Sequence, residues 1–127
     1  MKIIGVTGGV GSGKTELLHY IEKNYRCRIL LADEASHEVM QKGGRIYEPL
    51  VALLGSSVLD SSGEINRKEM AARIFSHEEL LGRVNALIHP AVREFILEAV
   101  AEEREKAAAG ADDAVDYFFL EAALLIE

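Results

Sequence analysis

The feature that most constrains this chain is a glycine-rich segment close to its N-terminus. Residues 8–15 read Gly-Gly-Val-Gly-Ser-Gly-Lys-Thr and follow a short apolar run at residues 3–6. They fit the pattern Gly-x-x-x-x-Gly-Lys-Ser/Thr, which joins a strand to the N-terminus of a helix. Glycines let successive backbone N–H groups point at a phosphate chain, and the helix end adds partial positive charge. The segment therefore predicts a P-loop that binds a nucleoside triphosphate.

Two side chains complete the expected chemistry of this loop. Lys14 adds a full positive charge for the β- and γ-phosphates, and the Thr15 hydroxyl is a candidate ligand of Mg²⁺. We assign Lys14 to catalysis as well as to nucleotide binding. The nucleotide-binding set is Gly8, Gly9, Gly11, Ser12, Gly13, Lys14, Thr15 and Glu16.

Composition limits the class of protein. The 127 residues are 49% apolar, which is enough to bury a core. A formal net charge of −7 without a basic cluster argues against a nucleic-acid surface. Cys27 is the sole cysteine, so an internal disulfide is excluded and a reducing cytoplasm is the default compartment. The sequence shows no signal peptide or apolar run of membrane-spanning length, so we expect a cytoplasmic protein without a membrane partner.

Apolar periodicity predicts one domain over residues 1–127, in which strands and helices alternate. The expected order is strand, helix, strand, several helices and strand. This order predicts a parallel sheet with right-handed crossovers and helices on its faces, an α/β fold of the three-layer α/β/α type. The expected elements are helix 14–24, strand 29–31, a helix that ends at 43–44, a helix with Ile46, Leu50, Leu53 and Leu54 on one face, and strand 115–120.

The middle of the chain is predicted to hold short helices. Asn66 with Glu69, and more clearly Ser76 with Glu79, have the spacing of capping boxes. Pro90 disfavours helix at the preceding residue and is well suited to the first turn, so a new helix is expected to start there.

Two carboxylates follow predicted strands, at the edge where a doubly wound sheet binds its ligands. Asp33 follows the second strand and is a candidate to accept a hydroxyl proton beside the γ-phosphate; a helix cap is an equally good interpretation. Glu121 follows the third strand, where a carboxylate typically holds Mg²⁺. A surface glutamate is the alternative for Glu121.

Three further polar residues are ambiguous on sequence grounds. His89, Arg93 and Arg67 lie near expected helix starts, where they can bind an anionic substrate or be ordinary solvated side chains. His19, His37 and His77 show no metal-ligand spacing and receive no role. Residues 60–63 read Asp-Ser-Ser-Gly, a short and weak match to a GTPase switch that we discount.

The motifs together resemble the dephospho-CoA kinase family over the entire chain. Residues 4–15 are similar to that family's Gly-Leu-Thr-Gly-Gly-Ile-Gly-Ser-Gly-Lys-Ser, and residues 31–33 to its Asp-Ala-Asp. Residues 63–67 follow its middle pattern, residues 85–90 its Leu-Asn-x-Ile-x-His-Pro, and residues 124–127 its Pro-Leu-Leu-Phe-Glu. The P-loop is shared with other kinases, whereas the His-Pro segment and the surroundings of Asp33 make the match specific.

The resemblance implies transfer of the γ-phosphate of ATP to the 3′-hydroxyl of dephospho-CoA, giving CoA and ADP. Asp33 would be the base on that hydroxyl, and Thr15 with Glu121 would organise Mg²⁺. A helical section at about residues 61–109 would cradle dephospho-CoA, the small-molecule partner, with Arg67, His89 and Arg93 lining it.

The sequence departs from the family pattern in a few places. Leu31 replaces the first Asp of Asp-Ala-Asp, Glu16 replaces a small hydroxyl residue, and Ala123 and Ile126 replace Pro and Phe. Family members continue past the position of Glu127 with an arginine-bearing lid, so we expect residues to be missing there and catalysis by this chain to be weak. Two alternatives therefore stay open: another small-molecule kinase, acting on a nucleoside or nucleotide, and a truncated ATP-binding module without turnover.

Overall fold

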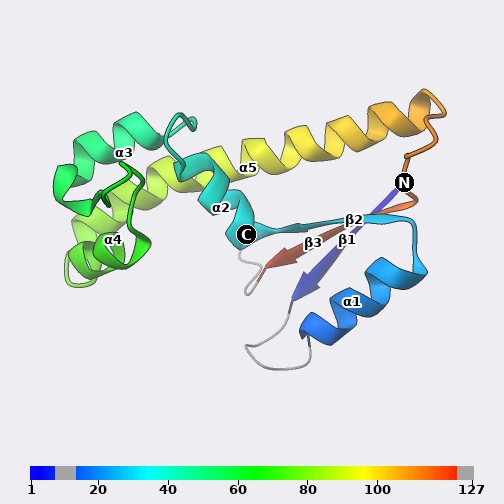
Figure 1. Cartoon of the computed structure of the whole chain (residues 1–127), viewed down its shortest axis with the longest axis horizontal. Coiled ribbons are helices and arrows are strands. Elements are labelled where there is room, and N and C mark those ends of the chain that lie inside the picture. The colour runs from blue at the N-terminus through cyan, green and yellow to red at the C-terminus, as the bar shows by residue number, and fades with distance from the viewer. Residues whose placement is uncertain (8–13, 123–127) are drawn as a thin grey trace. The chain divides into compact units, whose positions relative to one another are not determined.

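A computed structural model describes residues 1–7 and 14–122 of the chain (Figure 1). The chain divides into two compact units, one formed by Met1–Glu34 with Ile96–Glu127 and the other by Ala35–Phe95. The first unit contains a sheet, and the second consists of helices and short loops. None of the helices in the described ranges combines the length and the apolar composition that a membrane span needs.

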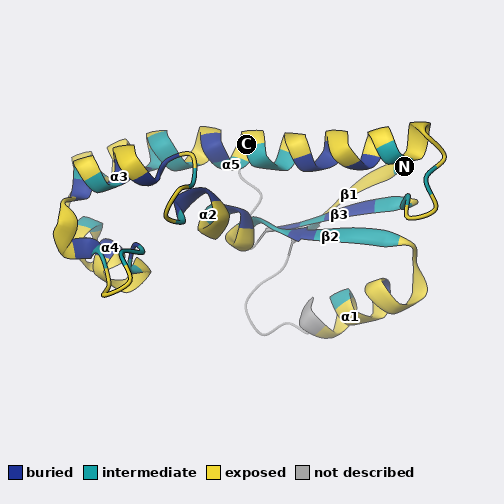
Figure 2. Cartoon of the chain, turned by 45° about the horizontal axis from the view of Figure 1, so that its top comes forward, coloured by how far each residue is buried: buried dark blue, intermediate teal, exposed yellow. Residues whose placement is uncertain are grey.

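The sheet of the first unit has three parallel strands. They are β1 (Lys2–Thr7), β2 (Cys27–Leu31) and β3 (Tyr117–Ala122), in the order β1-β3-β2. Helix α1 (Lys14–Asn24) connects β1 to β2, as residues 14–24 predict. Figures 1 and 2 place α1 on one side of the sheet and the C-terminal part of α5 (Glu78–Ala108) on the other. The predicted parallel α/β fold with helices on both faces is confirmed.

The third strand along the chain is the central one, which explains its apolar sequence. Phe118 is fully buried and Phe119 is 7% exposed, because β3 has a strand on each side and helices above and below it. A strand buried on both faces reads as a continuous apolar run rather than an alternating one. The strand begins and ends two residues later than the predicted range 115–120, so that Glu121 lies within it.

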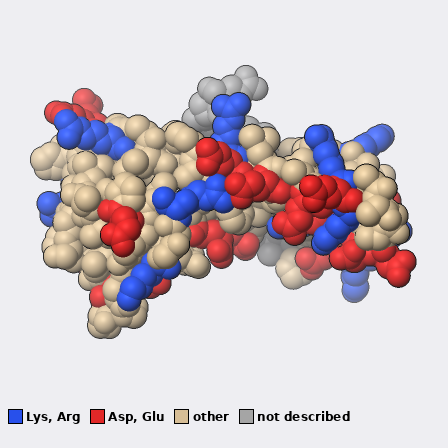
Figure 3. Space-filling model, turned by 90° about the horizontal axis from the view of Figure 1, so that it is seen from above, with Lys and Arg blue, Asp and Glu red and all other residues tan. Residues whose placement is uncertain are grey.

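A buried ion pair ties α5 to the sheet. Glu103 is only 3% exposed, and its Oε2 accepts a hydrogen bond of 2.8 Å from Arg28 Nη1 on β2. Lys106 Nζ lies 3.7 Å from the same oxygen, and the Arg28 guanidinium lies 5.9 Å from the centroid of the Phe118 ring. On the surface seen in Figure 3, acidic and basic side chains are interspersed. These contacts satisfy a carboxylate that would be costly to bury alone.

The second unit has its own hydrophobic core. Helix α2 (Ala32–Met40) starts directly after β2 and extends into this unit, where α3 (Tyr47–Leu54), the 3₁₀ helix η1 (Ser56–Val58), α4 (Arg67–Ile74) and the first part of α5 follow. Their apolar faces meet, as the predicted stripes require. The buried core residues are Val39, Met40, Ile46, Tyr47, Leu50, Leu54, Val58, Ile65, Met70, Val84 and Ala91.

The helix start predicted at Pro90 is wrong. Helix α5 is continuous over Glu78–Ala108, with Pro90 inside it. Packing explains the difference: Val84 and Ala91, one on each side of the proline and two turns apart, are 1% and 5% exposed in the same core. Pro90 has no N–H to donate to the carbonyl of Ala86, which is an exposed residue. Core packing on both sides of the proline therefore outweighs the lost hydrogen bond.

The two predicted capping boxes have different outcomes. Asn66 caps α4, because its side chain accepts from the N–H groups of Lys68 and Glu69 at 3.0 and 3.2 Å. In a capping box the N–H of the cap residue donates to the side chain three residues later. Here the Asn66 N–H donates instead to the carbonyl of Val58 at 2.7 Å. The Ser76 box is wrong: α5 begins at Glu78, and the His77 carbonyl accepts its first backbone bond, so Ser76 lies ahead of the cap position.

Opposite stability changes are expected from two glycine substitutions. Gly55 ends α3 at φ +89° and ψ 163°, a region that other residues scarcely populate. A Cβ at Gly55 meets no described atom within 4 Å, so Gly55→Ala adds backbone strain alone and should lower the free energy of unfolding by about 1–3 kcal/mol. Gly82 lies inside α5, and a Cβ there also meets no described atom within 4 Å. Gly82→Ala should therefore raise the free energy of unfolding by about 0.5–1 kcal/mol. Urea unfolding measures both; changes of the same sign would contradict these backbone assignments.

Candidate functional site

The register of the sheet aligns the carboxyl ends of its three strands. Glu121 on β3 is the Cα partner of Val6 on β1 and of Leu31 on β2. Thr7 is the last residue of β1 and immediately precedes the glycine-rich segment, while Asp33 follows Leu31 by two residues. Three segments far apart in the sequence therefore reach one edge of the sheet, the edge at which ligands bind in open parallel sheets.

The glycine-rich loop itself is outside the described residues. Gly8, Gly9, Gly11, Ser12 and Gly13 all fall there, and so do the side chains of Lys14 and Thr15. The backbone of Lys14 opens α1, and Glu16 is exposed in the first turn of that helix. A helix N-terminus directly after this segment is the structural context that the sequence pattern requires.

Asp33 lies in the first turn of α2, as its second residue. Because α2 begins at Ala32, Asp33 lies inside the first turn of the helix rather than before it. Its exposed carboxylate is at the positive end of the helix, which stabilises a negative charge there. The placement fits an ionised carboxylate that is accessible to a ligand.

Glu121 differs from an ordinary surface glutamate. It lies within β3 and is 8% exposed, in the central position of the sheet edge. Carboxylate oxygens are hard ligands of the kind that Mg²⁺ prefers. No group of three or more His, Cys, Asp or Glu side chains in residues 1–7 and 14–122 is arranged to hold a metal. Mg²⁺ sites of kinases use only one or two carboxylates together with substrate phosphates, so Glu121 fits such a site.

The three ambiguous residues all lie on helices of the second unit. Arg67 is the first residue of α4. His89 and Arg93 lie inside α5, four residues apart and thus on the same face, rather than at a helix start. All three side chains are exposed.

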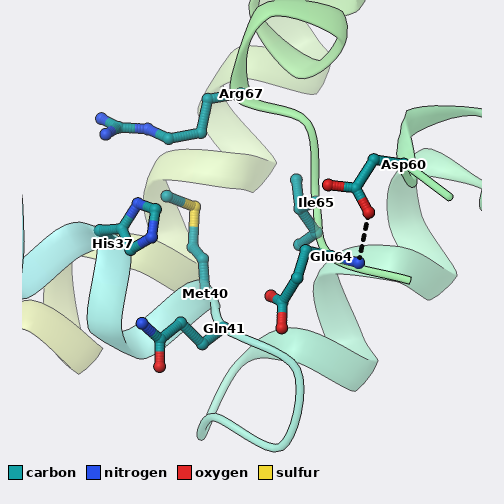
Figure 4. A pocket seen from close by; sticks show the side chains of 7 residues that line it. All are labelled: His37, Met40, Gln41, Asp60, Glu64, Ile65 and Arg67. Atoms are coloured by element: carbon teal, nitrogen blue, oxygen red, sulfur yellow. Dashed lines mark hydrogen bonds between the residues drawn. The ribbon is translucent and has the colours of Figure 1, made fainter. Parts of the chain in front are cut away.

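Arg67 and His37 both line a cavity of about 390 Å³, although the sequence predicts no role for His37 (Figure 4). The end of α2 and the residue after it contribute His37, Met40 and Gln41. The segment before α4 and the first residue of that helix contribute Asp60, Glu64, Ile65 and Arg67. The sequence does not predict this position of His37, because the two segments meet only in the fold.

Asp60 fixes the shape of the segment that borders this cavity. Its Oδ1 accepts hydrogen bonds from the Ser62 hydroxyl at 2.6 Å, the Ser62 N–H at 2.9 Å and the Glu64 N–H at 3.1 Å. The Ser62 hydroxyl, followed by the Ser62 N–H, lowers the pKa of Asp60. The turn is therefore supported by an ionised carboxylate at neutral pH, and this support is lost as the pH falls through the lowered pKa.

The comparison with family models decides the affiliation of the chain. The model described as CoaE, dephospho-CoA kinase, matches residues 2–127. The chain belongs to the dephospho-CoA kinase family.

Individual dephospho-CoA kinases support this assignment. The chain is 35% identical to the dephospho-CoA kinase of Dehalococcoides mccartyi over 127 residues, which are 100% of this chain and 60% of that protein. It is 37% identical to that of Geobacillus kaustophilus over 94 residues, 74% of this chain and 46% of that protein. The chain thus spans about half to three fifths of the length of these dephospho-CoA kinases.

Solved structures agree on the fold. The crystal structure of TT1252 from Thermus thermophilus matches with a TM-score of 0.71 and 26% identity, over 94% of this chain and 55% of that one. Dephospho-CoA kinase from Campylobacter jejuni matches with a TM-score of 0.70, over 94% of this chain and 57% of that one, and at 17% identity it bears on the fold alone. The fold of this chain is therefore shared with solved structures.

Proposed function

We propose that this chain carries the ATP-dependent kinase reaction that converts dephospho-CoA to CoA. The acceptor is an alcohol, the 3′-hydroxyl of the ribose, and the products are CoA and ADP. The observation that carries this proposal is the sheet register, which aligns Glu121 with the end of β1 and with the strand that leads to Asp33. Membership of the dephospho-CoA kinase family supplies the acceptor.

The proposed chemistry assigns one task to each residue of this edge. Lys14 and the N–H groups of the loop hold the β- and γ-phosphates of ATP. The Asp33 carboxylate accepts the proton of the 3′-hydroxyl. The oxygen of that hydroxyl bonds to the γ-phosphorus of ATP, and the bond from this phosphorus to the oxygen of ADP breaks. An accessible carboxylate at a helix N-terminus is suited to this task because it is ionised before the reaction and neutralised by it.

Mg²⁺ is part of the proposal because kinases use it to neutralise charge that develops on the phosphates. The Glu121 carboxylate and the Thr15 hydroxyl are the residues that would hold it. The burial of Glu121 within the central strand supports this assignment, since a fixed carboxylate holds a metal with little loss of side-chain freedom.

The substrate section is proposed at about residues 61–109 of a single kinase domain, with Arg67, His89 and Arg93 as contacts of dephospho-CoA. Their exposure and their positions on α4 and α5 support the proposal. We further propose that the protein acts in the cytoplasm.

Competition between acceptors tests the proposed function. The chain is given limiting Mg·ATP and an equimolar mixture of dephospho-CoA, adenosine and AMP, and the phosphorylated products are separated by chromatography. We expect phosphate to appear on dephospho-CoA in preference to the other two. Preferential phosphorylation of adenosine or AMP would instead assign the chain to nucleoside or nucleotide chemistry.

A further inference from the structure

The cavity of the second unit is poorly suited to phosphate. Asp60 and Glu64 place two carboxylates in its lining, against one guanidinium from Arg67. The Ser62 hydrogen bonds keep Asp60 ionised at neutral pH. A pyrophosphate in this cavity would face two like charges, which disfavours it. The lining selects instead for a neutral part of a ligand that offers hydrogen-bond donors to carboxylates.

The other residues that line the cavity indicate which neutral group of a ligand would fit there. Met40 and Ile65 are 5% and 9% exposed and present an apolar surface. Figure 4 shows the Gln41 amide and the Glu64 carboxylate at one end of the cavity, with Arg67 at the opposite end. A glutamine amide matches the N6 amine and N7 of adenine in a bidentate manner, and a carboxylate accepts from an amine. A flat purine with an exocyclic amine satisfies both requirements.

Glu64 is held in position by the fold. Its Oε2 accepts a hydrogen bond of 2.9 Å from the Lys42 N–H, and its own N–H donates to Asp60. Tyr47 Oη donates to the Gly63 carbonyl at 2.5 Å, which ties the same segment to α3. A polar group fixed in this way recognises a ligand with little loss of conformational entropy.

We propose that this cavity binds the adenine base of dephospho-CoA, with Gln41 and Glu64 as the partners of its exocyclic amine. The inference rests on the proposed function and assigns the base of its acceptor.

Titration calorimetry with two acceptors tests the assignment. The probes are dephospho-CoA and its analogue in which hypoxanthine replaces adenine, so that the amine becomes a carbonyl while the phosphates and pantetheine are unchanged. Wild-type chain should bind dephospho-CoA about tenfold or more tightly than the analogue, since a hydrogen bond to a charged group is lost. Glu64→Gln should remove this difference or reverse it. The amide oxygen can still accept from Lys42 N–H, so the segment stays folded. The amide nitrogen then faces the ligand, where it donates to the carbonyl of the analogue but cannot accept from the amine of adenine.

Glu48→Gln is the matched control, since it makes the same change at an exposed residue of α3 that is not part of the cavity lining. It should keep the wild-type difference between the two ligands. Equal affinity of wild-type chain for both ligands would overturn the adenine site and leave the proposed function standing. A difference that survives Glu64→Gln would also overturn it. Failure of folded wild-type chain to bind dephospho-CoA at all would contradict the proposed function, and the adenine site with it.

Discussion

The Asp33→Asn variant is expected to transfer phosphate about 10²- to 10⁴-fold more slowly than the wild-type chain, the range that a general base contributes. Asparagine keeps the size of the side chain but cannot accept the proton of the acceptor hydroxyl. Because Asp33 is in the first turn of α2, outside the phosphate-binding loop, affinity for Mg·ATP should stay within about threefold of the wild-type value. Single-turnover transfer and calorimetric titration with Mg·ATP measure the two effects separately.

Glu34→Gln provides the control for this experiment. Glu34 is the next residue of the same helical turn, is also exposed, and loses the same charge at the helix N-terminus. If Asp33 acted only on the helix dipole, both variants would lose about 0.3–1 kcal/mol of stability and neither would lose much activity. Equal transfer rates in the two variants would show that Asp33 is not the base.

The Phe118→Ala variant is expected to lose about 3–5 kcal/mol of unfolding free energy, the usual cost of removing a buried phenylalanine side chain. Phe118 is fully buried in the central strand and lies beneath the Arg28 guanidinium, so the substitution leaves a cavity and removes a cation–π contact. A loss of this size is a large part of the 5–15 kcal/mol that typical domains possess. Thermal and urea unfolding followed by circular dichroism measure it.

Phe75→Ala is the matched control for the core prediction. Phe75 is 90% exposed in the turn between α4 and α5, so its removal should change the unfolding free energy by no more than about 0.5 kcal/mol. A loss at Phe75 as large as the loss at Phe118 would contradict the assigned core.

The part of the fold that local patterns control could be predicted from the sequence. A strand, a glycine-rich segment and a helix follow one another in residues 2–24, and the continuous apolar run around Phe118 indicates a buried strand wherever it pairs. Strand order could not be read in the same way. The placement of β3 between β1 and β2 depends on pairings between residues about 90–115 positions apart, which leave no local signal.

The errors in the middle of the chain have a common physical cause. Pro90 carries a local preference to start a helix, yet Val84 and Ala91 pack in one core and keep α5 continuous through it. Local preference is a weak guide when buried residues on both sides favour another structure.

The candidate site was predictable only where its residues follow strands. Asp33 and Glu121 stand out because they come after apolar runs, and the register then brings those strands to one edge. His37 and Gln41 could not be linked to Glu64 and Arg67 from the sequence, since more than 20 residues separate the two groups. Lys42 and Tyr47 hydrogen-bond to the segment before α4, which borders the cavity, and these contacts form only in the folded chain.

The most direct test of the central proposal is a native mass spectrum of the folded chain mixed with Mg·ATP and dephospho-CoA, in which bound ligands and products are identified together. The proposal predicts that dephospho-CoA binds to the chain and that CoA and ADP appear. A chain that binds ATP, shows the expected helix content by circular dichroism, and neither binds nor phosphorylates dephospho-CoA would contradict it.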